Sequence, residues 1–72
     1  SAQISDAEIG VRQADEGLER AKSLQAKGVA TQAQLDNAVN AADSARAKLD
    51  VAKKALGASQ AQLGVIDAQI AA

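Results

Sequence analysis

The chain has 72 residues, a formal net charge of −1 and no Cys, His, Pro, Met or aromatic residue. Because it lacks imidazole and thiol groups, we expect neither an enzyme nor a metal or cofactor site. Balanced charge and the absence of aromatic rings argue against nucleic-acid binding, and no apolar run approaches the roughly 20 residues that span a bilayer.

The first predicted element is a helix over residues 1–27. Its apolar and small residues follow a seven-residue repeat, which is typical of a coiled coil. Such a repeat places one narrow seam along the helix, and the charged residues lie outside it. The seam positions are Ile4, Ala7, Val11, Ala14, Leu18, Ala21 and Gln25.

A short tip over residues 28–31 separates the two helical segments. Gly28 is a stop signal, because glycine adopts the left-handed conformation that ends many helices. Thr31 and Gln34 form a capping box, in which the Thr31 hydroxyl accepts from the backbone N–H of Gln34 and the Gln34 side chain reaches back. A connection this short forces antiparallel neighbours.

The second predicted helix covers residues 32–71 and has the stronger repeat. Six consecutive repeats indicate a left-handed coiled coil. The fold class is therefore all-α, an antiparallel two-helix coiled-coil hairpin that forms one domain over residues 1–72. The first core positions are Leu35, Ala42, Leu49, Leu56, Leu63 and Ile70, and the second are Ala38, Ala45, Ala52, Ser59 and Ile66.

The two helices differ in length. Folding about Val29 pairs the first helix only with residues up to about position 58, which leaves Leu63, Val65, Ile66 and Ile70 without a partner in this chain. We expect the chain to be a piece of a longer protein that supplies more of the first helix. In its absence we expect copies to associate.

Charged residues on the second helix lie in rows along its outer edges. Asp36, Asp43 and Asp50 recur every seven residues on one edge, and Arg46 and Lys53 line another. The first interpretation is a solvated face with local pairs such as Asp43 with Arg46, which contribute little when exposed. The alternative is a lateral contact with an identical neighbour.

The most informative residues stand near the tip. Arg20 and Leu24 share a helix face that is turned by roughly 100° from the core seam, so we expect Leu24 to be exposed or half-exposed. A single surface leucine is ordinary, and Arg20 could pair with Glu16 or stabilise the helix dipole. The alternative is a partner-binding role for both.

Arg20, Leu24 and Thr31 at this spacing, followed by Gln32 to Asp36, resemble the hairpin tip of periplasmic adaptor proteins, also called membrane fusion proteins. These serve tripartite efflux pumps and type I secretion systems. The family's tip carries Ser where this chain has Thr31, which keeps the hydroxyl and adds a methyl group. Residues 62–70 are similar to adaptors that serve ABC-type macrolide exporters.

The resemblance implies a structural connector in the periplasm of a Gram-negative bacterium, with the parent protein anchored at the inner membrane. Such adaptors form a ring, commonly a hexamer, above an inner-membrane transporter that contacts domains absent here. Their hairpin tips meet a TolC-like outer-membrane channel. On this basis we expect Leu24 to be the apolar anchor, Arg20 a donor to the channel and Thr31 a cap and polar contact, with Gln32 and Gln34 as secondary contacts.

Two other functions remain open. The chain could be a plain dimerisation coiled coil of a scaffold protein, in which case the exposed leucine is incidental. It could also be an amphipathic helix on a lipid surface, although such helices favour bulky apolar faces and basic polar faces, and this chain has neither. Liposome binding would test the second alternative.

Overall fold

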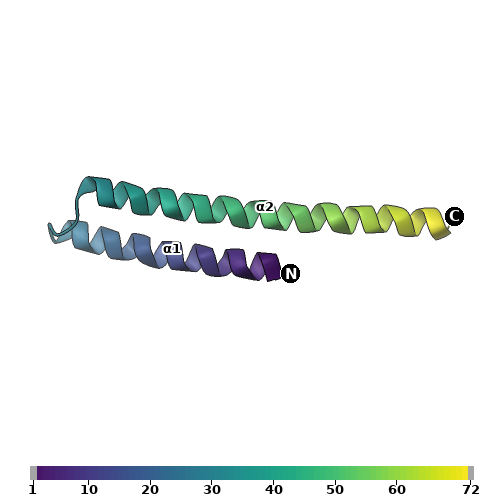
Figure 1. The fold of residues 1–72 in the computed structure, drawn as a ribbon, viewed down its shortest axis with the longest axis horizontal. Coiled ribbons are helices and arrows are strands. Elements are labelled where there is room, and N and C mark those ends of the chain that lie inside the picture. Colours follow the sequence, from purple (N-terminus) through teal and green to yellow (C-terminus); the bar gives the residue numbers. More distant parts are fainter. Residues whose placement is uncertain (1, 72) are drawn as a thin grey trace.

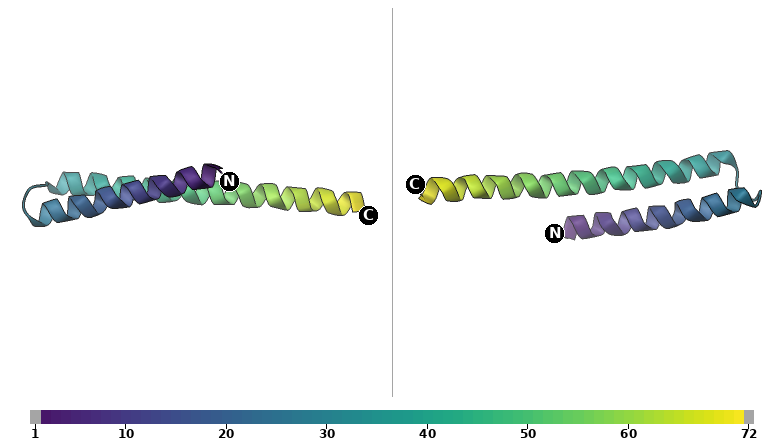
Figure 2. Two further views of the ribbon diagram at one scale, coloured as in Figure 1. Left: turned by 90° about the horizontal axis from the view of Figure 1, so that it is seen from below. Right: turned by 180° about the vertical axis from the view of Figure 1, so that it is seen from behind.

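The computed structural model describes the backbone of residues 2–71 and the side chains of residues 2–61. Two helices, α1 (Ala2–Ala26) and α2 (Gln32–Ala71), run antiparallel side by side and are joined by one turn (Figures 1 and 2). The molecule is a rod with extents of 67 × 16 × 11 Å. The predicted all-α helical hairpin is thereby confirmed.

The end of α1 lies close to the predicted boundary. The helix ends at Ala26 and not at Lys27, although the Lys27 backbone N–H still donates to the Ser23 carbonyl at 3.2 Å. Lys27 is therefore the C-cap residue of α1. Residue 1 lies outside the described part, and α2 begins at Gln32 and ends at Ala71.

One narrow seam holds the two helices together. Among the described side chains only Ala42 is fully buried, with 1% of its surface exposed. The others on the seam are half-buried, because two helices alone cannot cover both sides of their contact. These half-buried residues occur at the predicted core positions: Ile4, Ala7, Val11, Ala14, Leu18, Ala21 and Gln25 on α1, and Leu35, Ala38, Ala45, Leu49 and Ala52 on α2.

The seam has two flanks of different character. The charged flank consists of the residues directly after each second core position. The glycine flank consists of the residues directly before each first core position. The charged flank comprises Glu8, Asp15, Lys22, Val39, Arg46 and Lys53, and the glycine flank comprises Gln3, Gly10, Gly17, Leu24, Gln34, Ala41, Lys48 and Ala55.

An ion pair crosses the charged flank. Arg46 Nη2 lies 2.5 Å from Asp15 Oδ1 on the other helix, whereas Arg46 Nη1 lies 3.8 Å from Asp43 Oδ1 on its own helix. The predicted local pair of Arg46 with Asp43 is therefore the weaker of its two contacts. The short cross-helix contact joins α1 and α2 near the middle of their overlap.

Towards its C-terminal end α2 continues past the beginning of α1 (Figure 1). Leu56 is 36% exposed and Ser59 is also exposed, so the core positions of α2 are no longer buried at the level where α1 begins. The predicted unpartnered residues Leu63, Val65, Ile66 and Ile70 lie outside the described side chains.

Candidate functional site: the hairpin tip

The turn is built on a glycine that ends α1. Gly28 has φ of 75°, the left-handed conformation that a side chain with Cβ disfavours. Its N–H donates to the Gln25 carbonyl at 2.9 Å, and the Val29 N–H donates to the Leu24 carbonyl at 2.8 Å. These two bonds are the Schellman motif, which satisfies the last carbonyls of a helix. The predicted stop signal at Gly28 is thus confirmed.

The predicted capping box opens α2. The Gln34 backbone N–H donates to Thr31 Oγ1 at 3.1 Å, and the Thr31 N–H donates to Gln34 Oε1 at 2.8 Å. The Leu35 N–H donates to the Thr31 carbonyl at 3.1 Å, the first bond of the helix ladder. Local partners therefore satisfy several of the backbone groups that the two helix ends leave open at the turn.

A glutamine pair ties the helices together just below the turn. Gln25 occupies a core position, and its Nε2 donates to Gln32 Oε1 at 2.7 Å. Gln32 Nε2 in turn donates to Asp36 Oδ1 at 2.9 Å. Gln32, which we predicted as a secondary partner contact, therefore has a structural role in which its amide is already engaged.

A shallow depression of about 290 Å³ lies beside the turn on the glycine flank. It brings together three of the predicted site residues, Arg20, Leu24 and Gln34. Thr31 and Gln32 do not line it. Four residues that we did not predict complete the lining: Gly17, Ala21, Val29 and Ala30.

Two of the exposed large apolar residues lie at this depression. Leu24 is 36% exposed, in agreement with the predicted half-exposure, and Val29 is 69% exposed, the highest value among the described large apolar residues. Val29 directly follows the left-handed glycine, a place where a hydrophobic residue often packs back on the helix. That position in the Schellman motif was the sequence signal that could have identified it.

The guanidinium group of Arg20 has no polar partner among the described residues. Within the described part of the chain its exposed guanidinium makes no ion pair or side-chain hydrogen bond, so the predicted pair with Glu16 is absent. Arg20 also stands outside the last turn of α1, where no basic residue occurs and where the dipole effect is concentrated. Neither of the two structural explanations for this arginine therefore applies.

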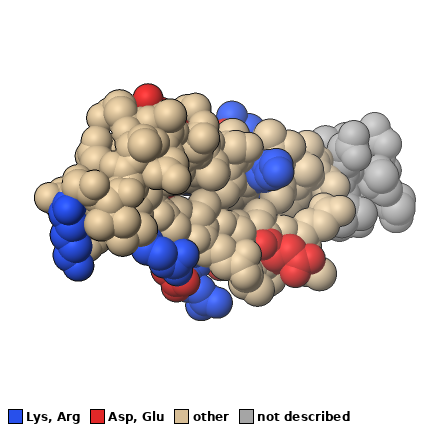
Figure 3. Space-filling model, turned by 60° about the vertical axis from the view of Figure 1, so that its left-hand side comes forward, with Lys and Arg blue, Asp and Glu red and all other residues tan. Residues whose placement is uncertain are grey.

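Charged side chains of both signs are scattered over the face that Figure 3 brings forward, with uncharged surface between them. The described residues contain no group of three or more acidic side chains placed to hold a metal ion. Nor does this part of the chain include a helix that is apolar enough over a sufficient length to cross a bilayer.

Comparisons with family models, with curated proteins and with solved structures give no match. The resemblance to periplasmic adaptor proteins is therefore carried by the tip residues Arg20, Leu24 and Thr31 and by the hairpin architecture. The geometry of these residues is the basis on which a function can be argued.

Proposed function

We propose that this chain is a structural connector of a tripartite efflux or secretion assembly, and that its tip docks on the periplasmic end of a TolC-like outer-membrane channel. In this proposal the parent protein forms a ring above an inner-membrane transporter. The hairpin contributes length and stiffness, and its tip contributes the contact. Transport itself belongs to the partners.

One observation carries the proposal: Arg20 and Leu24 line a single exposed depression at the end of a rod whose turn is held by local hydrogen bonds. An unpaired guanidinium beside a half-exposed leucine suits a partner surface with carbonyl or carboxylate oxygens next to an apolar side chain. Val29 enlarges the apolar area. The turn keeps this surface in place before binding, which lowers the entropic cost of association.

The contact is small, so a single tip binds weakly. A depression lined by seven residues offers far less area than a stable protein interface needs. Repetition around a ring raises the effective concentration of each tip and converts weak contacts into tight binding without any new contact. A stiff rod suits this use, because it presents every tip at the same height.

The test is a pull-down of the hairpin by the periplasmic tip of a TolC-like channel, with the hairpin tethered in several copies to restore avidity. The variant Arg20→Ala/Leu24→Ala removes both the donor and the apolar anchor. Ile9→Ala/Arg12→Ala is a matched control, since Ile9 is 44% exposed and Arg12 is also exposed, and both lie on α1 away from the tip.

We expect capture of the native hairpin and of the control, and loss of capture in the tip variant with its helix content unchanged by circular dichroism. Equal capture of the native and tip-variant hairpins would place the contact on the sides of the rod. Absence of capture even for tethered native hairpins would reject the channel as the partner.

A second candidate function is a plain dimerisation coiled coil. The observation that favours it is the glycine flank, where small side chains leave the seam open along the rod. This candidate predicts that Arg20→Ala/Leu24→Ala leaves every activity of the parent protein intact. It gives no account of the unpaired Arg20 or of the exposed Val29.

A further inference from the structure

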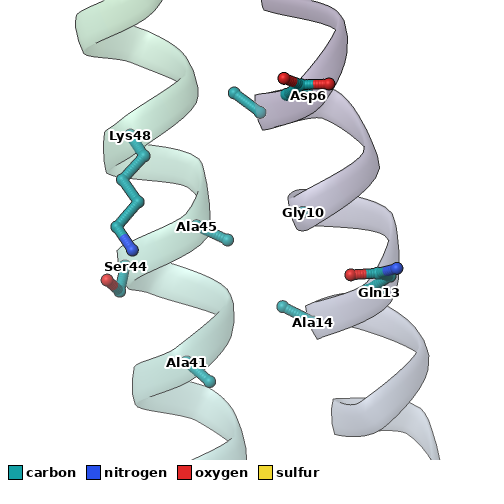
Figure 4. A pocket seen from close by; sticks show the side chains of 9 residues that line it. Asp6, Gly10, Gln13, Ala14, Ala41, Ser44, Ala45 and Lys48 are labelled. Atoms are coloured by element: carbon teal, nitrogen blue, oxygen red, sulfur yellow. The ribbon is translucent and has the colours of Figure 1, made fainter. Parts of the chain in front are cut away.

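Among the described residues, three surface depressions lie along the glycine flank. The largest, of about 690 Å³, lies between α1 and α2 in the middle of their overlap, with the smaller ones near the tip and near the start of α1. Figure 4 shows Ala14 and Ala45 pointing toward each other at its floor, with Gly10 at its rim. We refer to the line of depressions as the groove.

The glycines of the groove are not explained by packing within the chain. A Cβ added at Gly10 or at Gly17 would meet no atom within 4 Å. Both positions lie inside α1, where glycine weakens a helix relative to alanine. Their effect in this structure is to keep the groove open, which would let the surface of another helix approach closely.

Two opposite charges face the groove without a partner. Asp6 on α1 and Lys48 on α2 both line the largest depression, and among the described residues neither makes an ion pair. The charged flank differs, because there Asp15 and Arg46 neutralise each other across the seam. Among the described residues the groove thus carries one charge of each sign that its own chain does not pair.

We propose that the groove is the contact face for a second copy of this chain, packed face to face and parallel, with the two-fold axis along the rods. This arrangement lays α1 of each copy on α2 of the other and keeps both tips at the same end. Asp6 then lies on the helix that packs against α2 of the second copy, within reach of the long side chain of Lys48 of that copy, and the symmetry makes this pair twice. An antiparallel face-to-face arrangement lays α1 on α1 and pairs neither charge.

The area indicates a weak, reversible dimer. The 25 residues of α1 cover about 37 Å of the rod at about 1.5 Å per residue. With a rod width of 16 Å, each copy buries on the order of 600 Å², which is the lower end for a specific interface. A contact over all of α1 is centred near Ala14 and includes Leu24 at its end. The inference does not rest on binding of the tip to a channel.

The first experiment is sedimentation velocity of the whole chain over a range of concentrations. We expect Asp6→Lys or Lys48→Asp alone to raise the dimer Kd by about tenfold, since each places two like-charged pairs in the contact. The double variant Asp6→Lys/Lys48→Asp restores the pairs and returns the Kd to the native value. Glu8→Lys and Lys53→Asp, the same changes on the charged flank, leave the Kd unchanged.

Gly10→Gln provides a second variant with a different mechanism. Its side chain has open space within the monomer, so the hairpin stays folded and its melting temperature rises, while the filled groove weakens the dimer. A chain that stays monomeric up to millimolar concentration overturns the proposal. A dimer that is insensitive to Gly10→Gln and to the charge changes overturns it as well.

The orientation can be tested because the chain contains no cysteine. We expect an equimolar mixture of the single variants Gln13→Cys and Ser44→Cys to form mainly the mixed disulfide, as α1 lies on α2 of the other copy. Predominance of the two symmetric disulfides would overturn the parallel arrangement.

Discussion

At the scale of single residues, two glycines in the same helical hairpin have opposite effects. Gly28 has φ of 75°, so Gly28→Ala forces a Cβ into the left-handed conformation and should lower the free energy of unfolding by about 1–2 kcal/mol. Gly10 lies within α1 in open space, so Gly10→Ala should raise it by about 0.8–1 kcal/mol.

Urea unfolding followed by circular dichroism, at a concentration where the chain is monomeric, measures both changes. The two variants control for each other, because the substitution is the same and only the backbone conformation differs. A shift of the same sign in both would contradict the assignment of Gly28 as the residue that ends α1.

The sequence alone was sufficient to predict the turn, because its signals are local. Gly28 and the box formed by Thr31 and Gln34 lie within seven residues, and the structure joins them with the expected hydrogen bonds. The partner of Arg46 was missed for the opposite reason. Asp15 is remote in sequence, and its approach depends on the register between the helices, which no local pattern encodes.

At the scale of the helices, the contact between α1 and α2 depends on small residues at its centre. Ala42 is 1% exposed, so Ala42→Leu must push the helices apart and should lower the free energy of unfolding by about 1–3 kcal/mol. Ala47→Leu is the matched control on the same helix, at an exposed position, and should change it by less than about 0.5 kcal/mol.

Thermal unfolding of both variants measures this difference. Equal melting temperatures would mean that the seam is loose enough to accept a leucine, and would contradict the close approach at Ala42. The seven-residue repeat predicted which residues form this seam. It left the contrast between the two flanks unnoticed, since the flanks become distinct surfaces only when a second helix, antiparallel and in one register, lies beside the first.

At the scale of the molecule, different interactions hold the turn and the seam of the hairpin. The turn is held by hydrogen bonds that do not depend on the seam, and the seam is thin and alanine-rich. The tip depression forms one end of the groove, and the largest depression lies nearer the other end of α1. A parallel pair joined along all of α1 would cover the tip depression, so pairing through the groove would compete with docking through Arg20 and Leu24.

The shape of the rod gives a prediction for small-angle X-ray scattering. The Cα radius of gyration is 18.7 Å, far above the roughly 11 Å of a compact chain of this length. A parallel dimer through the groove adds width but no length, because the second rod lies about 8–10 Å away, so the radius of gyration should stay near about 20 Å as concentration rises. The forward scattering per unit mass should double over the same range.

Association through the end of α2 has a different signature. Pairing of residues beyond Ser59 of two copies would place the rods end to end, and the radius of gyration would rise steeply together with the forward scattering. A concentration series of the native chain beside Gly10→Gln separates the two routes, since only the groove dimer is weakened by the added side chain. A steep rise that persists in Gly10→Gln would reject the groove as the contact between copies.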